Sequence, residues 1–240
     1  MTAQSHPPVI LLTRPADPSA RFATALRARF PDLHIVTSPL IAPTFPLVSL
    51  PGRKWTAVIF TSETAVQAAK RIAADGHTLP ELAFCVGDQT AQTAQAAGFQ
   101  ALSAQGDGAT LLAFIQAQSL RGPMLYLHGR ETRLDIAERL ESSGIETFSC
   151  LTYAQNAQPL TAEATALLHA PSAILAPVFS PRTGQILAQE CARIGATAPL
   201  HVVAISAAAG AAFPQANLTL TCRPDATAML AAIALRLDAP

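Results

Sequence analysis

The chain has 240 residues, and its sixteen basic and sixteen acidic residues give a formal net charge of zero. Half of the residues are hydrophobic and 13% are charged, against roughly 25% in an average globular protein, so a disordered chain is excluded. No basic excess or Lys/Arg stripe marks a nucleic-acid-binding surface. An anionic ligand would therefore be held by a few placed arginines and backbone N–H groups, and not by a general positive field.

Residues 1–8 show neither the basic segment nor the apolar core of a secretory signal. The longest stretch of small apolar residues, 202–213, is too short and too rich in Ala and Ser to cross a bilayer. We therefore expect a cytoplasmic protein without a membrane span. The cysteines lie far apart beside apolar runs, so we expect small buried hydrophobes and neither disulfides nor metal ligands at Cys85, Cys150, Cys191 and Cys222.

Short apolar runs alternate with helical patterns along the chain. Val9 to Thr13 is typical of a buried strand, and Phe22 and Leu26 recur at the spacing of one helical face. Further strands are predicted at 57–60, 83–86, 124–127, 173–176, 201–205 and 218–221. Helices are predicted between them, with segments at 111–115 and 133–140 and with ends near Phe30, Gly76, Gly98 and Gly144. Strands that are apolar on both faces indicate parallel sheets covered by helices.

Two extended runs break this alternation, because neither leads directly into a helix. The first runs into a Pro-rich segment, and the second is followed by a polar one. We predict that they are linker strands, at about 34–40 and 148–154. The chain would then form one discontinuous α/β domain, from 1–37 and 155–240, with a second α/β domain inserted into it, from 41–150.

Three blocks of sequence recur in the two predicted domains. Phe60 and Phe179, each before a hydroxyl residue and a helix, lie 119 residues apart, and so do segments 86–91 and 205–210. Residues 107–112 likewise resemble residues 225–230. A nearly constant offset indicates two domains of similar topology. We expect the functional site in the cleft between them.

Hydroxyl residues and one glycine stand where predicted strands end and helices begin, at Thr61, Ser62, Gly87, Thr90, Ser180 and Ser206. In open parallel sheets, ligands bind beyond the carboxyl ends of the strands, and the free N–H groups of helix N-termini suit carboxylates or phosphates. Any single hydroxyl residue is more simply explained as an N-cap that stabilises its helix by about 1 kcal/mol, although their shared place at the strand ends favours a ligand site. The sequence leaves both interpretations open.

Three arginines stand at the same predicted edges. Arg14 and Arg130 close strands, and Arg182 lies in the first turn of a helix, where a cation opposes the helix dipole. Guanidinium groups suit carboxylate ligands, although solvent exposure would also account for Arg182.

No dinucleotide fingerprint, P-loop, nucleophile elbow or H-E-x-x-H motif is present, and the histidines lack metal-ligand spacing, so we expect no cofactor and no metal. Tyr126 and His128 are expected to pack structurally. Tyr153, at the second linker strand, is predicted at the mouth of the cleft, where its hydroxyl could donate a proton. Packing of an aromatic ring within the linker is the alternative.

Taken together, the motifs resemble the uroporphyrinogen-III synthase family over essentially the whole chain. They are Leu12-Thr13-Arg14-Pro15, Phe60-Thr61-Ser62 with Ala65-Val66, Val86-Gly87 with Thr90-Ala91, Gly98-Phe99, Leu127 to Arg130, Thr152-Tyr153 and Phe179-Ser180-Pro181. The resemblance implies two doubly wound, flavodoxin-like α/β domains joined by a two-stranded linker. It also implies a monomeric lyase of haem biosynthesis that uses neither cofactor nor metal.

The implied reaction cyclises linear hydroxymethylbilane, with loss of water and inversion of the last pyrrole ring. Departure of the hydroxyl gives a reactive azafulvene that recombines through a spiro intermediate, whereas spontaneous closure gives the uninverted isomer. The enzyme must therefore mainly hold the substrate's ends and assist departure of the hydroxyl. By resemblance, Tyr153 is the candidate donor to the leaving hydroxyl, and Thr90 and Ser180 match hydroxyl positions at the cleft edges. The substrate carboxylates would be bound by backbone N–H groups and by Arg14, Arg130 and Arg182.

One loop departs from the family's pattern. In this family, the loop of the other domain that corresponds to residues 87–90 usually carries a glycine and a hydroxyl residue. Here that loop reads Ile205-Ser206-Ala207-Ala208-Ala209, so Ser206 alone supplies a hydroxyl. A regulatory relative without activity therefore remains an alternative. A two-lobed small-ligand binding module of the periplasmic type is another, although the missing signal peptide argues against it. Transient contact with hydroxymethylbilane synthase, the preceding enzyme, is also left open.

Overall fold

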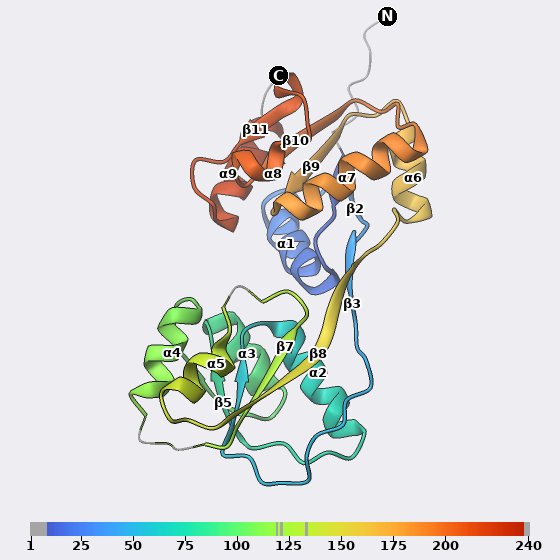
Figure 1. Ribbon diagram of the computed structural model, residues 1–240. Helices are drawn as coiled ribbons and strands as arrows, with labels where there is room; N and C mark the ends of the chain where they lie inside the picture. Colours follow the sequence, from blue (N-terminus) through green and yellow to red (C-terminus); the bar gives the residue numbers. More distant parts are fainter. Residues whose placement is uncertain (1–8, 119, 121, 133, 238–240) are drawn as a thin grey trace, which may run out of the picture. The chain divides into compact units, whose positions relative to one another are not determined.

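The computed structural model describes residues 9–118, 120, 122–132 and 134–237 and contains two sheets. Its contacts divide the chain into two compact units, Met1–Ala42 with Asn156–Pro240 and Pro43–Gln155. The chain thus passes from the first unit to the second after Ala42 and returns after Gln155. Figure 1 shows that each unit is built from a sheet and the helices that flank it.

The first unit is a five-stranded parallel sheet covered on both faces. Its strands are β1 (Val9–Leu12), β2 (Ile35–Thr37), β9 (Ile174–Val178), β10 (Leu200–Ala204) and β11 (Leu218–Leu220), in the spatial order β11-β10-β9-β1-β2. Its helices are α1 (Ala16–Arg29), α6 (Ala162–His169), α7 (Pro181–Ile194), α8 (Ala207–Gly210) and α9 (Ala226–Leu237), with a 3-10 turn, η1 (Gln215–Asn217). One core contains residues of α6, α7 and α8, and the other contains residues of α1 and α9.

The second unit contains a six-stranded sheet. Its strands are β3 (Ile41–Thr44), β4 (Ala57–Phe60), β5 (Leu82–Cys85), β6 (Gln100–Ser103), β7 (Met124–Gly129) and β8 (Thr147–Ala157), in the order β3-β8-β7-β4-β5-β6 and parallel from β8 to β6. Its helices are α2 (Glu63–Ala74), α3 (Asp88–Ala96), α4 (Gly108–Gln116) and α5 (Ile136–Ser142).

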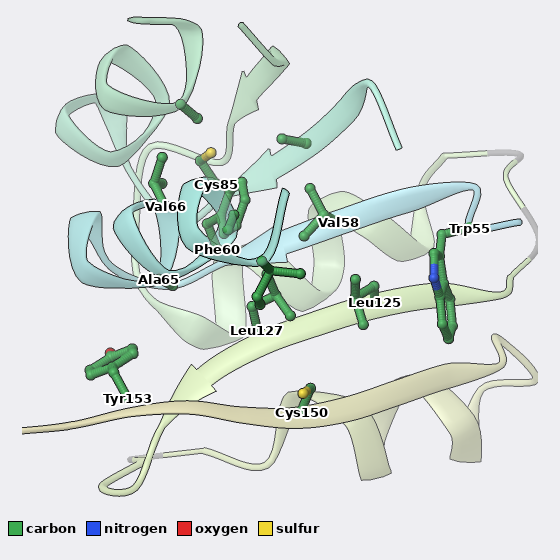
Figure 2. Packing of buried hydrophobic residues seen from close by; sticks show 14 of the residues in the cluster. Trp55, Val58, Phe60, Ala65, Val66, Cys85, Leu125, Leu127, Cys150 and Tyr153 are labelled. Atoms are coloured by element: carbon green, nitrogen blue, oxygen red, sulfur yellow. The ribbon is translucent and has the colours of Figure 1, made fainter. Parts of the chain in front are cut away.

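Alternate residues of the second sheet face two separate cores. Val58 and Phe60 pack with α2 and α3, whereas Ile59 and Tyr126 pack with α4 and α5. Figure 2 shows the first of these cores, with Ala65 of α2 close to the sheet. Because both faces are covered, the strands are apolar at consecutive positions, as predicted for parallel sheets.

The first sheet has the doubly wound strand order of flavodoxin-like folds. Strands β8 to β6 of the second sheet have the same spatial arrangement, but the chain runs through them in a permuted order. In the first unit, β1, α1 and β2 come first, and β9 to α9 follow the inserted unit. In the second, β4 to α4 come first, and β7, α5 and β8 come last. The repeated sequence therefore matches β4 to α4 with β9 to α9, whereas β7 corresponds to β1 only through a permutation of the chain.

The structure places the two unusual extended runs inside the sheets. Ile35 of β2 pairs with Ile10 of β1, and residues 147–153 pair with β7. The chain leaves and re-enters the first unit later, within β3 and near the end of β8. A strand at the edge of a sheet and a strand that leaves a domain have the same local sequence pattern when no helix follows at once. The sequence therefore could not distinguish a sheet strand from a linker strand here.

Most predicted elements are confirmed, with changes at their ends. The helix expected over 133–140 begins at Ile136, after Asp135 caps it, and Arg133 lies outside the described residues. The polar strand β6 and the short helix α6 had no clear signal in the sequence. Within the described parts of the chain, no helix is both long and apolar enough to span a membrane.

The four cysteines are free thiols, as predicted. Cys85 and Cys150 are buried, and burial raises the pKa of the Cys85 thiol to about 12. The expectation of burial is wrong for Cys222, which is exposed. It follows β11, a strand at the sheet edge, where no further strand of the described chain covers it.

Glu190 of α7 connects its helix to the segment before α6. Its carboxylate accepts hydrogen bonds from the Arg193 guanidinium at 2.7 Å and from the Leu160 N–H at 2.9 Å, and these bonds lower its pKa from 4.5 to about 2. Because the pKa is lower in the folded protein, this stabilisation is complete above about pH 4.5 and is lost as the pH falls toward 2.

We expect Glu190→Gln to lower the free energy of unfolding at neutral pH by about 1 kcal/mol. The difference from the unsubstituted protein should shrink as the pH falls from 4.5 toward 2, as measured by urea unfolding across that range. A difference that does not depend on pH would contradict this assignment.

Candidate functional site

The strand order of the second sheet creates a switch point between β4 and β7. From β4 the chain continues to β5 on one side, and from β7 it continues to β8 on the other. The helices that follow these strands therefore diverge, and ligands of such sheets bind at the carboxyl ends of the two strands. A cavity of about 630 Å³ lies there, lined by Thr61, Val86, Gly106, Asp107, Gly108, Ala109, Tyr126, Gly129, Glu131, Thr132, Leu134, Ile136 and Tyr153.

Tyr153 reaches this cavity because of an irregularity in β8. Leu151 pairs with His128, but Gly129 pairs with Tyr153, so Thr152 is an extra residue that bulges from the ladder. The hydroxyl of Thr152 secures the bulge by donating to the His128 carbonyl at 3.1 Å. Because side chains alternate along a strand, the extra residue turns Tyr153 onto the face that holds Cys150.

The ring of Tyr153 is 8% exposed and packs directly on Gly129. A Cβ at Gly129 would lie 2.5 Å from Cε2 of the tyrosine. The Tyr153 hydroxyl lies 2.9 Å from Oγ of Ser62, and the Arg130 N–H donates to the Tyr153 carbonyl at 3.0 Å. Figure 2 shows Tyr153 at one end of the buried layer that contains Leu127 and Ala65.

Tyr126 is a second tyrosine on the cavity wall. It is 2% exposed and belongs to the core, as predicted, and burial raises the pKa of its phenol, an effect that a hydrogen bond with the Thr61 side chain opposes. Its ring stacks on His128 with 4.9 Å between the centroids. The His128 imidazole is in turn hydrogen-bonded to Ser149 and to the Gly129 carbonyl, so both of its ring nitrogens have partners within the protein.

Adjacent residues at the end of β4 thus contact the two tyrosines. Thr61 bonds to Tyr126, and Ser62 bonds to Tyr153. Ser62 is also the N-cap of α2, since its Oγ accepts from the Ala65 N–H at 3.1 Å. For Ser62 the capping role is shown, and it coexists with a contact to the candidate catalytic hydroxyl.

The charged residues among the described cavity lining are Asp107 and Glu131. Asp107 caps α4 by accepting from the N–H groups of Ala109 and Thr110 at 3.0 Å, and its bonds with Thr110 hold the pKa of its carboxyl below the ordinary value. Both carboxylates are exposed at the cavity. Two aromatic rings, hydroxyl groups and nearby negative charge suit a flat ring that becomes positively charged more than they suit a carboxylate.

In the first unit, Arg14 and Ser180 follow the two strands of the corresponding switch point, β1 and β9. Arg14 follows β1, and its guanidinium lies 4.0 Å from the centroid of the Phe179 ring, next to Ser180 after β9. Ser180 caps α7 by accepting from the Thr183 N–H at 3.1 Å, and Ser206 caps α8 by accepting from the Ala209 N–H at 3.2 Å. Arg182 is exposed in the first turn of α7.

Gly87, Thr90 and Arg130, the other predicted residues of the second unit, are not among the described residues that line the cavity. Gly87 is the N-cap of α3, and Thr90 is buried in that helix at 6% exposure. Arg130 is exposed next to Gly129. Of the predicted set, the structure therefore brings Thr61, Ser62 and Tyr153 together in one cluster.

Among the described lining residues, only Thr61 and Tyr153 were predicted as site residues, so Asp107, Tyr126, Gly129 and Glu131 are among those that the prediction missed. Gly129 belongs to the motif from Leu127 to Arg130 and closes a strand, so its position could have indicated the site. Tyr126 carries only the signal of a core residue, because its contact with Thr61 depends on the pairing of β4 with β7.

Comparison with known proteins gives a consistent result. The family model of uroporphyrinogen-III synthase HemD matches residues 19–233. The solved uroporphyrinogen-III synthetase of Helicobacter pylori 26695 is similar in fold, with 16% identity, a TM-score of 0.60 and coverage of 96% of this chain and 99% of that one. A mutant uroporphyrinogen III synthase of Thermus thermophilus matches with 14% identity, a TM-score of 0.48 and coverage of 95% and 98%.

A search of curated proteins gives no match. The family assignment therefore rests on the family model, which covers most of the chain, and it confirms the resemblance inferred from the motifs. The chain belongs to the uroporphyrinogen-III synthase family, whose members cyclise hydroxymethylbilane in haem biosynthesis.

Proposed function

We propose that the substrate loses its terminal hydroxyl in the cavity of the second unit, with Tyr153 as the proton donor. The observation that carries this proposal is that Tyr153, whose hydroxyl contacts Ser62, lines a cavity at the switch point of the sheet. The phenol proton joins the leaving hydroxyl as the C–O bond breaks, and water departs. The electron pair of the pyrrole nitrogen replaces the lost bond, so the pyrrole becomes an azafulvenium cation.

The acidic residues that line the cavity support the formation of a cation there. A cation that forms near Asp107 and Glu131 is stabilised by their carboxylates, whereas a carboxylate of the substrate would be repelled there. Closure of the macrocycle later releases a proton from a pyrrole carbon, and this proton returns to Tyr153. The reaction involves no net oxidation or reduction, so it requires no redox cofactor.

The substrate carboxylates are proposed to bind outside this cavity, at Arg14, Arg130 and Arg182 and at the hydroxyl and N–H groups of Gly87, Thr90, Ser180 and Ser206. Thr61, which lines the cavity, would contact the reacting pyrrole ring instead. Gly87 and Ser180 support the proposal because each begins a helix of at least nine residues, whose first N–H groups attract anions. The four-residue α8 has too small a dipole for this, so Ser206 would contribute its hydroxyl only.

We further propose a cytoplasmic location. The four cysteines are free thiols, although one is exposed and another half-buried, and free thiols are typical of reducing compartments.

The test is formation of uroporphyrinogen III from hydroxymethylbilane that is generated in the assay by its synthase. We expect the unsubstituted protein to give mainly isomer III and Tyr153→Phe to lower kcat for this isomer about 100-fold, with isomer I accumulating by spontaneous closure. Chromatography of the oxidised porphyrins measures the ratio, and Glu190→Gln serves as a folded control. An unchanged ratio for Tyr153→Phe would show that Tyr153 is not the donor. A spontaneous product mixture from the unsubstituted protein would exclude the enzyme function.

A further inference from the structure

We propose that Ser62 is a positioning residue that keeps the proton of Tyr153 directed into the cavity. The inference rests on the proposed role of Tyr153, and it gives Ser62 a function that acts through the tyrosine. Its basis is the 2.9 Å contact between the two hydroxyls, in which either oxygen could be the donor by geometry alone.

The helix cap restricts the choice of donor. A serine hydroxyl has one proton and two acceptor positions, and the Ala65 N–H at 3.1 Å occupies one of those positions. If Tyr153 donated to Ser62, the serine oxygen would accept twice and its own proton would need another acceptor. If Ser62 donates to Tyr153, the free proton is the phenolic one. Tyr153 lines the cavity and Ser62 is not among its described lining residues, so the second arrangement presents the proton to the substrate.

Proton transfer makes this direction obligatory. Once the phenol proton has joined the leaving hydroxyl, the Tyr153 oxygen is an anion that can only accept hydrogen bonds. Ser62 must then donate to it, in a charge-assisted bond that is stronger than the bond to the neutral phenol. The Ala65 N–H and the N-terminus of the twelve-residue α2 polarise the serine oxygen in the same sense. The stabilisation therefore grows as the reaction proceeds, which lowers the barrier.

A pair of nearly isosteric variants separates this role from helix capping. Asn and Asp cap helices about equally well, so Ser62→Asn and Ser62→Asp should unfold at similar urea concentrations. The Asn amide can accept from the Ala65 N–H with its oxygen and donate to Tyr153 with its nitrogen, whereas an Asp carboxylate can only accept. In the Ser62→Asp variant, Tyr153 would donate to the introduced carboxylate, and its proton would no longer point toward the substrate.

We expect Ser62→Asn to keep kcat within about threefold of the unsubstituted protein and Ser62→Asp to lower it about 100-fold or more, within the range of a lost general acid. Repulsion between the new carboxylate and the anionic substrate would raise KM, so kcat at saturating substrate is the deciding quantity. Thr161→Ala, which removes the cap of α6 that accepts from the Ala164 N–H, controls for lost capping and should keep kcat unchanged. Equal kcat values for the Asn and Asp variants would overturn the positioning role. Activity of Tyr153→Phe equal to the unsubstituted protein would instead reject the donor role on which it rests.

Discussion

Replacing Gly129 with alanine is expected to lower kcat for uroporphyrinogen III by about 100-fold or more, although the residue has no functional group of its own. The added Cβ would lie 2.5 Å from Cε2, 2.6 Å from Cζ and 2.9 Å from the hydroxyl oxygen of Tyr153. The ring is almost fully buried, so it must leave its position against Ser62 to avoid the clash. A displacement of about 1 Å in a positioned catalytic group can cost roughly 100-fold in rate.

A double-mutant cycle tests whether Gly129 acts through Tyr153. In the Tyr153→Phe background, the further change of Gly129 to alanine should lower kcat by less than about threefold, because the hydroxyl is already absent. Gly52→Ala is the matched control in the same unit, since a Cβ there meets no atom within 4 Å and the glycine has no positive φ. Additive losses in the double variant would contradict the mechanism and would indicate a general disturbance of the cavity.

The sequence predicted the architecture well because its signals are local. Apolar runs such as Ala57–Phe60 and helix ends such as Gly98, whose φ is 95°, follow from backbone preferences within a few residues. The correspondence between β7 and β1 could not be detected from a constant offset in residue number. In the chain, β1 precedes the repeated segment of its unit, whereas β7 follows the repeated segment of the other unit. The repeat detected in the sequence therefore covered only half of each unit.

The candidate site was predicted as a set of residues but not as a geometry. Tyr153 was expected in a linker, whereas it lies in the sheet of the second unit and faces a cavity within that unit. Because side chains alternate along a strand, Thr152 would be expected on the same face of the sheet as Cys150. The bulge at Thr152 puts Tyr153 on that face instead. The contacts of Tyr126 and Gly129 likewise depend on strand pairing across distant segments, which leaves no local pattern.

The alanine-rich loop of the first unit, which departs from the family's pattern, continues into α8, a short helix that packs closely on its neighbours. Gly184 of α7 lies so close to α8 that its Cβ would stand 2.2 Å from the Ala209 carbonyl oxygen and 3.3 Å from Cγ1 of Val178. Gly210 is similarly tight, since its Cβ would lie 2.7 Å from Leu218. The glycines at 184 and 210 therefore allow α8 to pack closely beside α7 and β11.

Gly184→Ala is accordingly expected to destabilise the first unit by about 3 kcal/mol, at the upper end of typical overpacking effects, because the obstructing atom is a backbone oxygen and not a flexible side chain. Urea unfolding followed by circular dichroism measures the loss, with Gly52→Ala as a control that should change stability by less than about 1 kcal/mol. If the protein relieves the clash by moving α8, Ser206 moves with it, and KM should rise while kcat changes little, since Tyr153 belongs to the other unit. Unchanged stability together with unchanged KM would show that α8 shifts freely and that Ser206 contributes nothing to substrate binding.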